Sequence, residues 1–186
     1  MHKTNTDLEY RNSWDSYSKS LKVIKPLSAE STHLVYWRVC YPFPFKDRDY
    51  LYIRYACTLT AQTLLEIIES EQEKEEYKKL INNNLEKEYF VMAAIPSEEF
   101  DNSSDDPGLK AVKDGKCVRV KEFHSISIVT STNSGDVEKS LLYSYLFDNP
   151  AGNIPSSLIN WVAKTAMPKA LEQTKKAGDK YDSWKK

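Results

Sequence analysis

Residues 35–55, VYWRVCYPFPFKDRDYLYIRY, place eight aromatic rings and two prolines in one short stretch. Residues 33–41 alternate in side-chain character with the period of two that a β-strand requires, and they are rich in strand-forming residue types. Pro42 and Pro44 then interrupt the ladder because proline has no N–H group to donate, and residues 48–56 resume it. The stretch therefore predicts two antiparallel strands joined by a stiff aromatic loop.

The remainder of the chain reads as further strands followed by one long helix. Residues 61–82 carry glutamate and lysine in blocks and exceed what a hairpin loop needs, so we expect an inserted, solvated helix there. Runs of strands closed by a long helix indicate the α+β class with an antiparallel sheet. The other predicted elements are a first helix at 7–20, strands at 88–95, at 116–131 (long or broken) and at 140–148, and a helix from Pro155 with a kink at Pro168 and a frayed tail at 178–186.

Chain direction assigns every loop to one of the two ends of such a sheet. The loop at 42–47, the acidic loop at 96–115 and the turn at 149–153 fall at the end where the last helix begins. The inserted helix at 61–82 and the turn at 132–136 fall at the opposite end. The first of these ends is the predicted mouth of an internal cavity.

Length, charge and motifs exclude several classes of protein. The 186 residues suit one domain, and a formal net charge of -1 offers no basic field for nucleic acid. The N-terminus lacks the apolar core of a leader and no uncharged apolar run approaches the roughly 18 residues that span a bilayer, so we expect a cytoplasmic protein. Three scattered cysteines predict neither disulfides nor a zinc site. No Ser/His/Asp or Cys/His arrangement is evident, and we expect no catalysis, cofactor or metal.

Three separated blocks resemble the lipid-transfer (START) domain family: YWRVCYPFPFKDRDYLYIR, VRVKEF and YLFDNPAGNIPSSLINWVAKTAMPKAL. They occur in the family's order, and the resemblance covers residues 7–178 approximately. It implies a helix-grip fold, in which a curved antiparallel sheet packed on a long C-terminal helix encloses one lipid. Two departures are expected. The family's first helix and first three strands have no counterpart, so residues 1–186 read as a single, N-terminally incomplete domain, and the helix at 61–82 is an insertion.

The resemblance assigns Trp37 and Tyr50 to positions whose rings surround a choline group in the family, and Phe123 falls where similar members carry a tyrosine. A quaternary ammonium has no N–H donor, so ring faces hold it, each contributing roughly 0.5–2 kcal/mol. Without the resemblance, a core role in a twisted strand pair is the better interpretation of Trp37 and Tyr50. Strict alternation also puts Arg119 and Lys121 on the face of Phe123, so a bulge must intervene if that face is apolar.

Arg11 and Asp15 lie four residues apart in the predicted first helix. In the family, as the resemblance implies, such an arginine binds the lipid phosphate and the aspartate positions it. A guanidinium suits this role because its fork meets two phosphate oxygens, and a nearby carboxylate offsets the cost of holding the cation in an empty site. The alternative is a surface ion pair worth under about 1 kcal/mol.

Other candidate cavity positions follow from strand and helix faces. Val39 shares a strand face with Trp37 and should line the same cavity. Ser125 falls where similar family members carry a glutamine, so a polar contact there would be shorter. Leu158 and Val162 lie on one side of the last helix, which suits either a core or an acyl-chain wall.

The favoured function is binding of one phospholipid, preferably phosphatidylcholine, and its transfer between membranes. Phe43 and Phe45 in the proline loop are candidates for the transient membrane contact, with ordinary loop packing as the alternative. Phosphatidylethanolamine should bind less well because an apolar cage leaves its N–H donors unpaired, at a cost of roughly 1–3 kcal/mol. The alternatives are a START-fold binder of ceramide, a sterol or another phospholipid, and an interaction module without a functional lipid cavity that binds a protein partner through helix 61–82.

Overall fold

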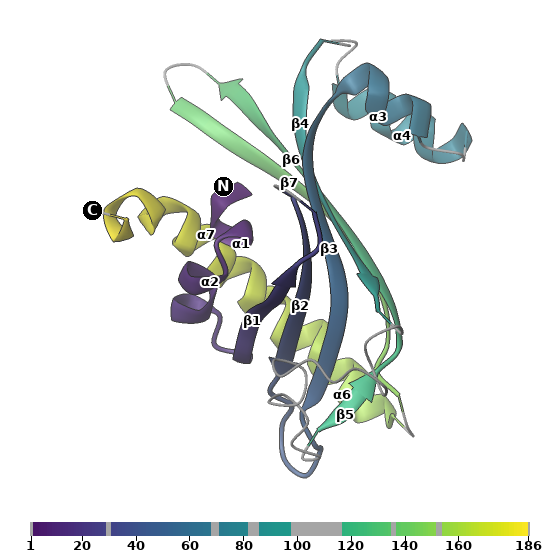
Figure 1. Cartoon of the computed structure of the whole chain (residues 1–186), viewed down its shortest axis with the longest axis vertical. Helices are drawn as coiled ribbons and strands as arrows, with labels where there is room; N and C mark the ends of the chain where they lie inside the picture. The colour runs from purple at the N-terminus through teal and green to yellow at the C-terminus, as the bar shows by residue number, and fades with distance from the viewer. Residues whose placement is uncertain are drawn as a thin grey trace.

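The computed structural model describes residues 2–28, 31–67, 71–81, 86–97, 117–134, 137–151 and 154–185. These residues form a curved sheet of mainly antiparallel strands, with a long C-terminal helix along its hollow side (Figure 1). The predicted α+β helix-grip architecture is therefore confirmed. The strands are β1 (Ser18–Pro26), β2 (Thr32–Val39), β3 (Arg48–Thr60), β4 (Glu88–Pro96), β5 (Val118–Val120), β6 (Glu122–Ser134) and β7 (Val137–Asn149). The helices are α1 (His2–Thr6), α2 (Leu8–Trp14), α3 (Ala61–Ile67), α4 (Glu71–Ile81), α6 (Ser156–Trp161), the π-helical segment η1 (Val162–Ala166) and α7 (Met167–Trp184).

The sheet follows the order of the chain with one exception. Strands β1, β2, β3, β4, β6 and β7 are antiparallel neighbours in that order, while the short strand β5 pairs with β3 in parallel. In the β2–β3 pair, Trp37 lies directly opposite Tyr50. Because side chains alternate between the faces of a strand, this register puts both rings on the same face of the sheet.

The predicted first helix at 7–20 is too long, and the structure has a strand in its second half. Helix α2 ends at Trp14, and Asp15 takes an extended conformation while its N–H donates to the carbonyl of Arg11. Strand β1 begins at Ser18 and pairs with β2 across two register shifts, between Ser18 and Ser20 and between Val23 and Lys25. These bulges interrupt the alternation that would have identified the strand in the sequence.

The predicted interruption near Phe123 is present. Strand β5 ends at Val120 and β6 begins at Glu122, so Lys121 lies outside both strands. The break removes strict alternation, and the Phe123 side chain is 6% exposed in the same apolar cluster as Tyr50 and Val120. The change of partner from β3 to β4 at this point turns Phe123 toward the core.

The two ends of the sheet carry the elements that chain direction predicts (Figure 1). The inserted segment forms two helices, α3 and α4, at one end, with residues 68–70 and residue 82 outside the described residues. The described start of the C-terminal helical region, α6, lies at the other end with β5. There the Arg48 guanidinium donates to the carbonyls of Pro150 and Lys46, at 2.9 and 2.6 Å, which joins the loop before β3 to the turn after β7. Most of the acidic loop lies outside the described residues.

The predicted kink near Pro168 takes the form of a π-helical turn. In η1 the helix widens, and the Met167 N–H donates to the carbonyl of Val162, five residues back. Proline cannot donate an N–H and its ring crowds the preceding turn, and a π-turn relieves that crowding without ending the helix. Helix α7 therefore continues from α6 along the sheet.

The frayed tail predicted at 178–186 is wrong, because α7 runs to Trp184 and packs on the N-terminal helices. The Tyr10 hydroxyl donates to the Ala177 carbonyl at 2.7 Å, and the Tyr181 hydroxyl donates to Asp7 Oδ2 at 3.0 Å. The rings of Tyr10 and Tyr181 meet edge to face, with centroids 5.0 Å apart. Helices α1 and α2 thus hold α7 near its C-terminal end.

Replacing Tyr10 with phenylalanine should lower the free energy of unfolding by about 1 kcal/mol, because the buried hydrogen bond to Ala177 is lost while the ring remains. Urea unfolding followed by tryptophan fluorescence measures the change. Tyr55→Phe is the matched control, since Tyr55 is 42% exposed on β3. Equal stability of Tyr10→Phe and Tyr55→Phe would contradict the described docking of α2 on α7.

Replacing Leu64 with alanine should cost about 2–5 kcal/mol of stability, because this side chain is only 2% exposed where α3 packs on β4 and β6. Ile67→Ala is the control on the same helix, because Ile67 is 56% exposed. Chemical denaturation of both variants measures the difference. A loss under about 0.5 kcal/mol for Leu64→Ala would mean that α3 is a solvated appendage.

Candidate functional site

A cavity of about 350 Å³ lies between the sheet and the C-terminal helix. Its volume falls within the roughly 300–1,000 Å³ of ordinary small-molecule sites, and most of its wall is apolar. Residues of α1, α2, five strands, α6, η1 and the first part of α7 line it. Two lining residues on opposite sides, Leu146 of β7 and Leu171 of α7, are 55% and 61% exposed. The cavity therefore opens to the surface between β7 and α7.

Three aromatic rings meet at one part of the cavity wall. The ring centroids of Trp37 and Tyr50 are 5.3 Å apart, and those of Tyr50 and Phe123 are 5.0 Å apart with the rings perpendicular. Trp37 Nε1 donates to Ser18 Oγ at 3.2 Å, which fixes the indole from the neighbouring strand β1. The structure thus brings together all three predicted ring residues, two from the β2–β3 pair and one from β6.

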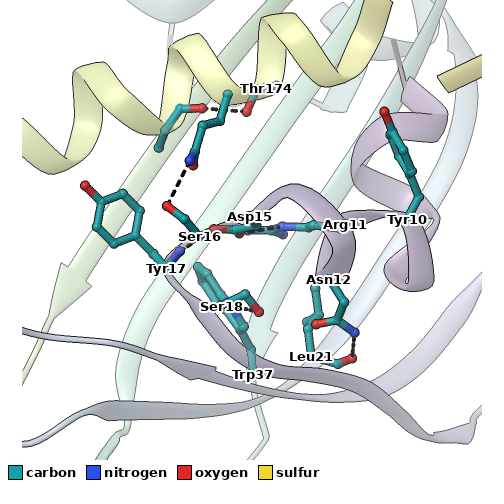
Figure 2. Close-up of polar contacts among 12 residues, drawn as sticks. Tyr10, Arg11, Asn12, Asp15, Ser16, Tyr17, Ser18, Leu21, Trp37 and Thr174 are labelled. Atoms are coloured by element: carbon teal, nitrogen blue, oxygen red, sulfur yellow. Dashed lines mark hydrogen bonds and ion pairs between the residues drawn. The ribbon is translucent and has the colours of Figure 1, made fainter. Parts of the chain in front are cut away.

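Arg11 and Asp15 line the same cavity at the end of α2 (Figure 2). Arg11 Nε and Asp15 Oδ2 are 3.2 Å apart, and the two side chains are only 19% and 9% exposed. The Arg11 guanidinium also lies over the Trp37 ring, 4.7 Å from its centroid. The pair is therefore not the exposed surface pair of the alternative interpretation. An arginine that already stacks on Trp37 also demonstrates that this ring face accepts a cation.

Asp148 is a cavity residue that the sequence analysis did not single out. Its Oδ2 accepts a hydrogen bond from the Tyr50 hydroxyl at 2.8 Å, and its buried Oδ1 has no donor among the described residues. Burial raises the pKa of the Asp148 carboxyl, while the Tyr50 hydrogen bond and nearby Arg48 oppose this shift. Burial and the adjacent Asp148 carboxylate in turn raise the pKa of Tyr50. A carboxylate therefore stands directly beside the aromatic wall.

Arg54 is a second cavity residue missed in the sequence. It is 7% exposed, its guanidinium donates to the Thr6 carbonyl at 3.0 Å, and its buried Nε has no partner among the described residues. Burial lowers the pKa of Arg54, with the nearby Arg11 cation as a smaller cause. Strand alternation from Tyr50 through Tyr52 would have placed Arg54 on the cavity face.

The remaining predicted positions divide into lining and non-lining residues. Val39, Ser125 and Val162 line the cavity. Leu158 is 3% exposed and is not among the lining residues. Trp161, which comes directly before the π-turn, lines the cavity from the same helix instead. The roles assigned to these residues stay predictions.

The proline loop presents its first phenylalanine to solvent. Phe43 is 96% exposed, whereas Phe45 is half-buried and its N–H donates to the Pro42 carbonyl at 2.9 Å. A fully exposed phenylalanine suits either a membrane or a protein contact, so the membrane role of both residues also stays a prediction.

In the described part of the chain, no group of three or more His, Cys, Asp or Glu side chains is placed to hold a metal ion. None of its helices combines the length and the apolar composition needed to cross a bilayer.

The family comparison agrees with this fold and cavity. The family model of the START domain matches residues 102–183. The predicted resemblance to START lipid-transfer domains is thereby confirmed, and the chain has the helix-grip architecture of that class.

Several individual proteins are similar to this chain. The chain is 31% identical to the phosphatidylcholine transfer protein of Mus musculus over 177 residues, and 32% identical to that of Bos taurus over 176 residues. These matches cover 94% of this chain and 64% of each relative, so the chain spans about two thirds of their length. It is 25% identical to the mitochondrial StAR-related lipid transfer protein 7 of Mus musculus, over 90% of this chain and 36% of that protein. The crystal structure of human STARD10 has the same fold, with a TM-score of 0.61 at 20% identity, over 99% of this chain and 59% of that one.

Asp148→Asn should make the protein more stable at neutral pH. The raised pKa means that the ionised carboxyl costs stability once the pH exceeds its unfolded-state pKa, and this cost is complete above the folded-state pKa. Asparagine removes the charge and keeps an oxygen to accept from Tyr50. The gain in Tm should therefore be largest at pH 8 and should shrink as the pH falls through the raised pKa of the folded-state carboxyl toward that of the unfolded chain.

Thermal unfolding of both proteins between pH 4 and pH 8 measures this difference. Asp179→Asn is the control, because it makes the same charge change at an exposed position of α7. A Tm for Asp148→Asn that is lower than wild type at every pH would show that the carboxylate is stabilised in the fold.

Proposed function

We propose that the protein binds one phospholipid in the cavity, with phosphatidylcholine favoured, and carries it between membranes. The observation that carries this proposal is the arrangement of one cavity wall, where a cation-accepting set of rings stands next to buried arginine. Such a wall matches a zwitterionic head group, whose cationic and anionic parts are only a few bonds apart.

The cationic part of the head group would lie against the rings. The Arg11 guanidinium lies over the Trp37 ring, 4.7 Å from its centroid, so this indole already takes part in a cation–π contact. The trimethylammonium group would contact the ring surface that Arg11 leaves uncovered. Tyr50 and Phe123 extend the aromatic surface from that ring. A trimethylammonium group satisfies such faces because it carries charge without N–H donors.

The anionic phosphate would lie against arginine. Arg11 reaches the cavity with Asp15 holding its Nε, which leaves its terminal nitrogens for phosphate oxygens. Arg54 lies further along the same strand face as Tyr50, and no carboxylate among the described residues pairs with it. The buried Arg54 and the partly buried Arg11 together favour an anionic ligand group.

The acyl chains would follow the apolar remainder of the wall. Its side chains come from β4, β7 and α7, for example Met92, Leu142 and Leu171. The opening between β7 and α7 gives the chains a route to the surface. Transient membrane contact by Phe43 and Phe45, a cytoplasmic location and a lack of catalysis belong to the same proposal. The similarity to phosphatidylcholine transfer proteins supports this choice of lipid.

Native mass spectrometry after incubation with mixed liposomes tests the proposal. We expect a one-to-one adduct with phosphatidylcholine, and Trp37→Leu should reduce it about tenfold because one ring face is lost. Trp184→Leu is the matched control, since Trp184 lies on α7 away from the cavity lining.

The other results distinguish the alternatives. An adduct with ceramide or a sterol alone, insensitive to Trp37→Leu, would indicate the same fold with another ligand. A folded protein that takes up no lipid would contradict the proposal and would favour an interaction module, with the 61–82 segment as its first candidate surface.

A further inference from the structure

Asp148 is a cavity carboxylate without a direct ion pair among the described residues, although the charge of nearby Arg48 partly offsets its raised pKa. The other acid on the wall, Asp15, is paired with Arg11 at 3.2 Å. The basic side chain that influences the pKa of Asp148 is Arg48. Its guanidinium donates hydrogen bonds to backbone carbonyls, those of Pro150, Lys46 and Ala151, and lies over the Tyr41 ring, 4.8 Å from its centroid. Asp148 itself receives only the Tyr50 hydroxyl among the described residues.

We propose that Asp148 determines the head-group preference of the cavity by selecting a positively charged group, a trimethylammonium or a primary ammonium, over an uncharged one. The inference rests on the proposed function and names the specificity of the same site. Asp148 lies beside the aromatic part of the cavity wall, because its Oδ2 is 2.8 Å from the hydroxyl of Tyr50.

The charge of Asp148 favours a cationic ligand group. An ionised carboxylate in a largely buried wall is unfavourable unless a cation compensates it. Burial raises the pKa of Asp148, and the opposing effects of the Tyr50 hydrogen bond and of Arg48 do not cancel this shift. A cationic head group between Asp148 and the Trp37 ring would supply the missing charge, so that rings and carboxylate act on the same ligand atom.

One oxygen of Asp148 is also open to a hydrogen-bond donor from a ligand. The buried Oδ1 of Asp148 has no donor among the described residues, and a carboxylate oxygen can accept from more than one N–H group. A primary ammonium brings such donors, which an aromatic cage alone would leave unpaired. Asp148 therefore weakens the discrimination against phosphatidylethanolamine that the rings by themselves predict.

The charges along the wall also give the ligand a direction. Asp148 contacts the ring set through the Tyr50 hydroxyl, whereas Arg11 contacts it through the Trp37 ring. A lipid with its ammonium toward Asp148 and its phosphate toward Arg11 meets both charges favourably. A glycerol head group keeps the phosphate contact and gains nothing from Asp148, which makes phosphatidylglycerol the informative comparison.

A purely structural role for Asp148 makes a different prediction. If its function is to hold the Tyr50 hydroxyl, asparagine should replace it, because the amide oxygen accepts the same hydrogen bond. Selection by charge instead requires the carboxylate. Asp148→Asn thus separates the two roles, and the predicted gain in thermal stability shows whether the variant is folded.

The experiment is competitive loading from vesicles that contain equal amounts of phosphatidylcholine, phosphatidylethanolamine and phosphatidylglycerol with identical acyl chains, followed by native mass spectrometry at pH 7.5. Wild type should load both zwitterionic lipids over phosphatidylglycerol. In Asp148→Asn we expect the ratio of zwitterionic to glycerol adducts to fall about tenfold, since one partly buried unit charge is removed. Asp179→Asn should retain the wild-type ratio.

Each outcome decides something. An unchanged ratio in Asp148→Asn, or a wild type that loads the three lipids equally, overturns the assignment of Asp148 while phospholipid binding stands. A wild type that loads none of the three contradicts the proposed function itself. An equal decrease of all three adducts in Asp148→Asn, with their ratio unchanged, would assign Asp148 a structural role and also overturn the inference.

Discussion

The pairing of Trp37 with Tyr50 across β2 and β3 is the constraint on which the cavity depends. One backbone register brings both rings to the hollow side of the sheet, and a slip of one residue would turn them to the opposite face. The register is reinforced from a distant part of the chain. Strand β5 pairs with the start of β3, and Arg119 binds Asp49 through two hydrogen bonds of 3.0 and 2.9 Å. Because β5 leads directly into β6, that ion pair also fixes where Phe123 meets Tyr50.

Much of this arrangement could be predicted from the sequence, because it follows from local pattern. Alternation identifies β2 and β3, and it predicts which residues share a face. The interruption at Lys121 could also be anticipated, since an apolar Phe123 is incompatible with unbroken alternation past Arg119. The order of strands and one closing helix is enough to define the fold class.

The errors lie where long-range contacts override local pattern. Strand β1 is concealed by two bulges, and its pairing with β2 supplies an order that residues 18–26 do not encode by themselves. The C-terminal residues look like a polar tail, but Tyr181 is held by Asp7, which is 174 positions away in the chain. Asp148 was passed over for the same reason: its significance comes from the Tyr50 hydroxyl, 98 positions distant. A carboxyl whose pKa is raised by burial costs stability at neutral pH, and such costs are common in binding sites.

The C-terminal helix has a further consequence for how the protein is made. Helix α7 follows every strand in the sequence, and its position depends on contacts with α1 and α2 at sequence separations of 167 and 174 residues. During synthesis the sheet therefore emerges before the element that covers its hollow face. Until α7 leaves the ribosome, the aromatic wall has no helix over it. Closure of the cavity is then a late folding event, which depends on the last segment of the chain to be made.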